Sequence, residues 1–182
     1  RQIDLEAEYR HEFNFGRLQL NGSATWTLEA YEELLGTAEN AEDNVYVPEF
    51  VGELNARFDR NDWTFFWGAD FIGETSNEKY NAALSPASQG NLVVPREGNA
   101  TNTRTARVVA KTDPWISHDV SVRYNLDTWR FTVGVTNVFA AQPPKMSGIQ
   151  VVSWYTRVGN TLAGGPYDII GRRGFVSVRK TF

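Results

Sequence analysis

Cysteine is absent from this sequence of 182 residues. Its absence excludes disulfide frameworks, thiolate metal sites and cysteine nucleophiles. Positive charge is also scarce, because 18 lysines and arginines stand against 22 acidic residues and leave a formal net charge of -4. A chain with that balance lacks the basic surface that nucleic-acid binding requires. No apolar run reaches the roughly 18 residues of a transmembrane helix, and helix signals are weak throughout.

Aromatic residues are plentiful, at 13% of the chain with six tryptophans and eleven phenylalanines. Apolar and polar residues alternate with period two in seven segments, which predicts β-strands with one apolar and one polar face. These segments are residues 3–13, 17–28, 50–59, 63–72, 116–126, 129–139 and 171–182. The stretch "LEAYEELLG" at 28–36 continues the second segment, and a two-turn helix is its alternative.

Short polar turns at 14–16, 60–62 and 127–128 alternate with long loops at 36–48, 76–112 and 140–170. Across each short turn the apolar positions switch between odd and even numbers. A tight hairpin requires this switch if both strands are to keep their apolar side chains on one surface. Two-residue turns would then place Glu12 opposite Arg17 and Asn125 opposite Arg130.

Aromatic residues gather beside the short turns and at the chain end, always on the apolar face. A belt of rings at one level is typical of a lipid headgroup boundary. We therefore predict that the apolar face meets lipid and the polar face meets water. Lys180, near the chain end, has a stem long enough to carry its charge to the interface. The predicted girdle consists of Phe13, Phe58, Trp63, Tyr124 and Trp129, with Phe182 at the same level.

The predicted fold is all-β, an antiparallel transmembrane β-barrel with short periplasmic turns and long extracellular loops. Bacterial single-chain barrels have even strand numbers, so residues 1–182 are expected to be the C-terminal portion of a wider barrel. Two alternatives remain open. One is a small complete barrel, an anchor or adhesin, with an eighth strand within 102–113. The other is a soluble carbohydrate-binding β-sandwich with the rings in its core.

Two stretches resemble the C-terminal end of TonB-dependent outer-membrane receptors: "WRFTVGVTNVFAAQPP" at 129–144 and "YDIIGRRGFVSVRKTF" at 167–182. The opening "RQIDLEAEYR" is similar to that family's "GIDL" strand, with Gln2 in place of the usual glycine. The matching C-terminal positions are Gly134, Val135, Asn137, Val138, Phe139, Pro143, Pro144, Tyr167, Asp168, Gly171, Arg172 and Phe182.

The resemblance implies the last strands of a barrel of about 22 strands in the outer membrane of a Gram-negative bacterium. The plug domain and the earlier strands would be absent from this chain. It further implies import of a scarce nutrient (a metal chelate, cobalamin or an oligosaccharide) with energy from the inner membrane. The implied partners are outer-membrane lipid and lipopolysaccharide, the remainder of the receptor, the TonB complex through the missing plug region, and the barrel assembly machinery. That machinery would read Phe182 as its signal.

No catalytic, metal or cofactor site is predicted, and the chain is not expected to be an enzyme. His11 and His118 lie in different segments on the apolar face without a third ligand at metal spacing, so we expect them to pack against neighbours. Arg123 and Arg130, on the polar face near the periplasmic end, would meet either plug carboxylates or water. Substrate contacts are expected from the loop at 140–170, whose stacking and hydrogen-bonding candidates are Trp154, Tyr155, Arg157 and Asn160.

Overall fold

The computed structural model describes the backbone of residues 1–29, 31–34, 37–40, 47–76, 92–96, 99–106, 111–145, 157–158, 161–162 and 166–182. Side chains are described for residues 1–29, 47–76, 111–145 and 166–182. Within these ranges no helix has the length and apolar character needed to cross a membrane.

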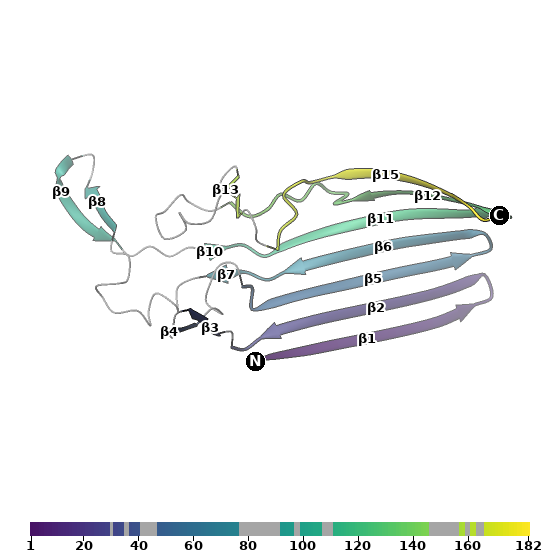
Figure 1. The fold of residues 1–182 in the computed structure, drawn as a ribbon, viewed down its shortest axis with the longest axis horizontal. Coiled ribbons are helices and arrows are strands. Elements are labelled where there is room, and N and C mark those ends of the chain that lie inside the picture. Colours follow the sequence, from purple (N-terminus) through teal and green to yellow (C-terminus); the bar gives the residue numbers. More distant parts are fainter. Residues whose placement is uncertain are drawn as a thin grey trace.

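Seven long strands form one antiparallel sheet, in which neighbours in space follow the order of the sequence (Figure 1). This arrangement confirms the predicted all-β antiparallel fold. The outermost strands are β1 and β15, so the sheet has two open edges. The strands are β1 (Gln2–Phe13), β2 (Gly16–Thr27), β5 (Phe50–Arg60), β6 (Trp63–Ile72), β11 (Trp115–Leu126), β12 (Trp129–Thr136) and β15 (Arg173–Lys180).

Two-residue turns connect β1 to β2, β5 to β6 and β11 to β12, all at the same end of the sheet (Figure 1). In two of them the first residue, Asn61 or Asp127, has a positive φ of 51° or 48°, a conformation that Asn and Asp tolerate well. The predicted register is confirmed at both tested positions. Glu12 Oε1 accepts a hydrogen bond from Arg17 Nε at 3.0 Å, and Asn125 Oδ1 accepts one from Arg130 Nε at 3.1 Å.

Long connections leave the other end of the sheet and contain short two-stranded ribbons. In the described part of 28–36, β2 has ended at Thr27 and residues 31–34 form a separate short strand, so these residues are neither a helix nor a continuation of β2. The described residues of 102–113, where an eighth strand was considered, do not join the sheet either, because residues up to 106 pair with β8 and residues 111–112 pair with β7 in separate ribbons. The ribbons pair β3 (Tyr31–Leu34) with β4 (Thr37–Asn40), β7 (Thr75–Ser76) with β10 (Lys111–Thr112), β8 (Leu92–Arg96) with β9 (Asn99–Ala106), and β13 (Arg157–Val158) with β14 (Thr161–Leu162).

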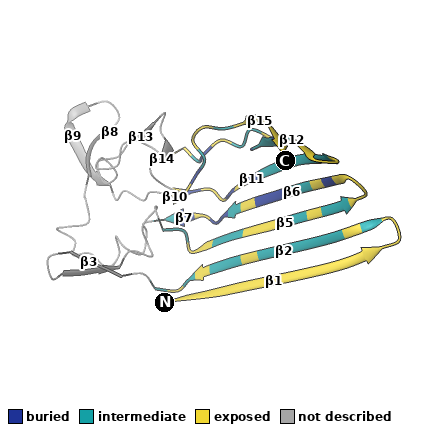
Figure 2. Ribbon diagram, turned by 45° about the vertical axis from the view of Figure 1, so that its right-hand side comes forward, coloured by how far each residue is buried: buried dark blue, intermediate teal, exposed yellow. Residues whose placement is uncertain are grey.

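The apolar face of the sheet is bare in the described part of the chain. Leu54, Val133 and Val176 are 45%, 54% and 77% exposed, whereas a sandwich would bury these side chains beneath a second sheet. The β-sandwich alternative is therefore wrong. Burial is greatest along β6, and the edge strands β1 and β15 are exposed over their whole length (Figure 2).

Aromatic rings contact one another at the short-turn end. The ring centroids of Phe13 and Phe15 are 5.2 Å apart, and those of Trp63 and Tyr124 are 4.6 Å apart. Phe15, which lies in the first turn, also contacts Phe58 on the other side, with the two ring centroids 6.0 Å apart. The structure thus gathers these predicted girdle residues at one level of the sheet, and their contact with lipid stays a prediction.

Lys180 lies among the rings at this same end. Its Nζ atom is 4.9 Å from the ring centroids of both Trp129 and Phe182. At this range a cation is attracted to the face of each ring. The charge of Lys180 is therefore held at the end of the sheet and away from the middle of the apolar face.

The sixth predicted strand is three residues too long. It was expected to reach Phe139, but β12 ends at Thr136 because Asn137 takes a left-handed backbone with φ of 49°. Phe139 is 74% exposed, and its ring packs edge-on against His118 at 5.2 Å.

Candidate binding surface on the polar face

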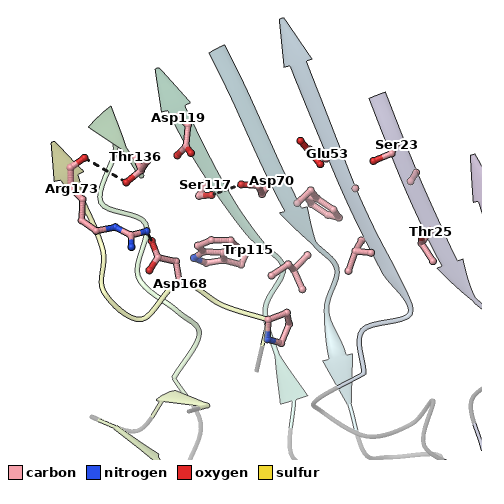
Figure 3. A pocket seen from close by; sticks show the side chains of 16 residues that line it. Ser23, Thr25, Glu53, Asp70, Trp115, Ser117, Asp119, Thr136, Asp168 and Arg173 are labelled. Carbon is pink, nitrogen blue, oxygen red and sulfur yellow. Dashed lines mark hydrogen bonds and ion pairs between the residues drawn. The ribbon is translucent and has the colours of Figure 1, made fainter. Parts of the chain in front are cut away.

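The polar face contains a hollow of about 430 Å³ in the half of the sheet nearer the long loops (Figure 3). Alternation brings side chains of β2, β5, β6 and β11 to this surface, and the ends of β12 and β15 add Thr136 and Arg173. The connection that leads into β15 supplies the remaining wall. The polar and indole-bearing residues that line the hollow are Ser23, Thr25, Glu53, Asp70, Trp115, Ser117, Asp119, Thr136, Asp168 and Arg173.

Strand register aligns the centre of the hollow in one row. Ser23 is opposite Glu53, Glu53 is opposite Asp70, and Asp70 is opposite Ser117. Ser117 Oγ donates a hydrogen bond to Asp70 Oδ2 at 3.4 Å, and Asn55 Nδ2 donates to Glu53 Oε1. Two carboxylates therefore lie side by side across a strand pair, a placement that destabilises a sheet.

The hollow carries an excess of negative charge. Arg173 is its one cationic lining residue among the residues described, and Arg173 Nη2 is already paired with Asp168 Oδ2 at 2.9 Å. Glu53, Asp70 and Asp119 form no ion pair within the described part of the chain. Three carboxylates thus face the same space without a compensating base.

Charge is unevenly distributed on the polar face. Most acidic residues lie in the half nearer the long loops and most arginines in the half nearer the short turns, while Glu12 and Asp59 lie beside the short turns and Arg173 lies at the long-loop end. Ion pairs such as Arg10 to Glu8 at 2.5 Å and Arg17 to Glu12 at 2.8 Å lie in the short-turn half or at its border. The acidic half includes Asp4, Glu6, Glu8, Glu53, Asp70 and Asp119, and the basic half includes Arg10, Arg17, Arg57, Arg123, Arg130 and Arg179.

Trp115 begins β11 at the long-loop end of the hollow. It is 7% exposed and packs edge-on against Tyr167, with the ring centroids 6.0 Å apart. The Tyr167 hydroxyl lies 3.2 Å from Thr112 Oγ1, which in turn lies 2.8 Å from Thr75 Oγ1. This hydrogen-bonded chain holds Trp115 in place, but the indole Nε1 itself has no hydrogen-bond partner in the part of the chain that the structure describes.

Asn137 anchors the connection that leads out of β12. Its backbone N–H donates to Asp119 Oδ1 at 2.8 Å, and its side chain exchanges two hydrogen bonds with the backbone of Ala141 at 2.7 and 2.9 Å. It is 1% exposed. Gly171, near the start of β15, has φ of +79°, which favours glycine because it has no Cβ. Neither residue lines the hollow, but Asn137 bonds to the lining residue Asp119, and Gly171 lies between the lining residues Asp168 and Arg173.

The predicted substrate-contact residues cannot be compared with this hollow. Trp154, Tyr155 and Asn160 lie outside the described residues, and Arg157 is described only as part of the β13 backbone. Their role stays a prediction.

The histidines and the predicted arginines are placed by the structure. His118 stacks on Trp67 at 5.7 Å, and His11 lies edge-on to Phe13 at 4.4 Å, so both pack among aromatic rings. Arg123 and Arg130 lie on the polar face in the short-turn half, away from the hollow. No group of three or more His, Asp or Glu side chains in the described ranges is placed to hold a metal ion.

Sequence reasoning did not single out the residues that line the hollow. Each of Ser23, Glu53, Asp70, Ser117 and Asp119 belongs to a polar face that alternation predicts. The missing information was their common level, because the long loops between β2 and β5 and between β6 and β11 do not determine register. The three short turns give a usable signal. If they lie at the same end of the sheet, counting residues outward from each turn places these side chains in one row across the strands.

A two-faced antiparallel sheet with tight turns at one end and long connections at the other defines the class of β-barrel membrane proteins. The family model described as "TonB dependent receptor-like, beta-barrel" matches residues 3–138. The chain belongs to this family of TonB-dependent receptor β-barrels. Comparison with curated proteins and with solved structures found no match.

Proposed function

We propose that residues 1–182 form the C-terminal part of the barrel of an outer-membrane receptor in a Gram-negative bacterium. This receptor imports a scarce nutrient, such as a metal chelate, cobalamin or an oligosaccharide, with energy delivered by the TonB complex. The family match over residues 3–138 supports this assignment. The observation that carries it is the contrast between the exposed apolar face and the charged polar face of a single sheet.

That contrast is what a barrel wall needs. Lipid cannot hydrogen-bond to the backbone, so a membrane-spanning sheet must pair every strand and turn apolar side chains outward. Leu54 and Val133 are exposed on one side, while Glu53 and Thr132 belong to the other. The apolar face meets lipid and the polar face lines an aqueous interior.

The two open edges of the sheet support the proposal that the remainder of the receptor pairs with them. The outer backbone groups of β1 and β15 have no strand partner in the sheet, and an unpaired edge is costly in lipid. Earlier strands of the intact receptor pair with both edges and close the barrel. A plug within that barrel contacts the TonB complex, and the assembly machinery reads the last strand with Phe182. The outer face contacts lipid and lipopolysaccharide.

Uptake by cells that produce the intact receptor tests this function. The substrates are a radiolabelled ferric chelate, cobalamin and an oligosaccharide, each compared with a strain that lacks the receptor. We expect receptor-dependent uptake of one of the three, and we expect it to stop when a protonophore collapses the inner-membrane gradient or when TonB is deleted. Receptor-dependent uptake that continues unchanged after both treatments would instead indicate a passive pore.

A further inference from the structure

We propose that the hollow on the polar face is a subsite for a positively charged small molecule that also bears oxygen acceptors, as an amino sugar does. This inference rests on the proposed function, because it names the chemical class of the cargo. It concerns the described lining residues alone. The candidates in the 140–170 loop have no part in it.

The first argument is charge. Glu53, Asp70 and Asp119 face the hollow, none of them is paired with a base among the described residues, and Glu53 lies directly opposite Asp70. A sheet gains nothing from this repulsion, since Gln or Asn at either position would satisfy the same polar surface. A cation bound between the carboxylates would turn a destabilising arrangement into charge-assisted hydrogen bonds. An anionic ligand would meet the repulsion instead.

The second argument is independent of charge and comes from Trp115. Its side chain is more than nine-tenths buried, its indole N–H has no acceptor, and the residue lines the same hollow. Figure 3 places the indole nitrogen on the edge of the ring that faces Asp168. A buried donor without an acceptor is destabilising. The nitrogen is buried, so a ligand oxygen can reach it from the hollow only after a small shift of the atoms that cover it. That oxygen would then accept the hydrogen bond that the indole N–H lacks.

The remaining lining fits an extended organic ligand. Ser23, Thr25, Ser117 and Thr136 supply hydroxyl groups that both donate and accept hydrogen bonds. In the described ranges the carboxylates do not converge as ligands of one metal ion. They are spread over β5, β6 and β11, which matches a molecule with several separated amine and hydroxyl groups.

Protection of a single cysteine tests the proposal in the intact receptor. This chain has no cysteine, so Ser23→Cys, in a receptor otherwise free of reactive thiols, places one thiol at the hollow. The thiol is modified with neutral methyl methanethiosulfonate in mildly acidic buffer. Three trimers serve as probes: glucosamine, which is cationic, N-acetylglucosamine, which is neutral, and galacturonate, which is anionic.

We expect the glucosamine trimer to slow modification roughly tenfold when it is present at about ten times its Kd, as the factor 1 + [L]/Kd requires. The other two trimers should leave the rate unchanged at the same concentration. Equal protection by the acetylated trimer, or any protection by trigalacturonate, would overturn the proposed class. So would the absence of protection by the glucosamine trimer at every concentration.

Variants identify the groups responsible. Glu53→Gln combined with Asp70→Asn should abolish protection, whereas Glu12→Gln, an acid of the same face near the short turns, should preserve it. Trp115→Phe keeps an aromatic ring but removes the indole N–H together with part of the ring system, and we expect it to weaken binding of the glucosamine trimer a few-fold. If protection survives the double variant, the carboxylates do not bind the amine and the proposal fails.

A second measurement needs no ligand, so it also tests the charge of the hollow in variants whose trimer binding is weak for reasons other than charge. At Ser23→Cys, a cationic methanethiosulfonate reagent should react faster than an anionic one after correction for their rates with a free thiol. The double variant should bring the corrected rates together. Equal rates in the unaltered hollow would contradict the inferred charge, while energy-dependent uptake in the separate assay would leave the proposed function intact.

Discussion

Replacement of Leu54 by arginine is expected to remove most of the folded receptor from the outer membrane. Leu54 lies near the middle of β5, is 45% exposed on the apolar face, and faces Gly22 and Ala69 on the neighbouring strands. An arginine on the lipid face near mid-bilayer costs about 2–4 kcal/mol. That is a large share of the 5–15 kcal/mol by which proteins are typically stable. The measurement is the folded, heat-modifiable band of the intact receptor in outer-membrane fractions.

Asn55→Arg is the matched control, because it puts the same side chain one residue further along the same strand. Asn55 is on the polar face, where its side chain already donates to Glu53, and an arginine there keeps a donor beside that carboxylate. We expect a near-normal folded band. If both variants were equally depleted, or equally tolerated, the assignment of lipid to one face and water to the other would be wrong.

Alternation and turn length made the sheet predictable. Each two-residue turn determines the register of its hairpin, so the opposition of Glu12 to Arg17 follows from counting alone. The faces follow as well, because a shift of one residue would exchange every apolar side chain with a polar one. Strand ends were less predictable, and the sixth segment ran past Thr136 because nothing in a period-two pattern reports a left-handed residue.

The candidate site was not predictable in the same way. Its central row depends on the registers of β2 with β5 and of β6 with β11, and long loops separate both pairs in the sequence. The local pattern therefore predicts that Glu53 and Asp70 lie on the polar face. It does not predict that Ser117 and Ser23 lie opposite them in the same row across the sheet. Trp115 is harder still, since its burial depends on Tyr167, more than fifty residues away in the sequence.

The motif residues show the converse case, in which a position was recognised before its physical role was evident. Asn137 and Tyr167 matched the family pattern by residue type alone. In the structure the first ends β12 and bonds to Ala141, and the second buries its ring against Trp115. Both hold the connection between β12 and β15 against the sheet, at the border of the hollow.

Asn137→Ala is expected to lower the free energy of unfolding of the intact receptor by about 2–4 kcal/mol. The change removes two side-chain hydrogen bonds to Ala141, each of which contributes about 0.5–1.5 kcal/mol. It also leaves a residue without a local hydrogen-bonding side chain at φ of 49°, and a non-glycine residue there carries strain of order 1–3 kcal/mol. The measurement is the guanidinium unfolding midpoint of the receptor in lipid vesicles.

Two further variants separate these contributions. Asn137→Gly relieves the backbone strain but still lacks the side chain, so its loss of stability should be smaller than that of Asn137→Ala and should report mainly the bonds to Ala141. Gln142→Ala, at an exposed position of the same connection, removes one surface hydrogen bond to Ala140 and should change stability by less than about 0.5 kcal/mol. If Asn137→Ala were as mild as Gln142→Ala, the buried asparagine would not anchor this connection.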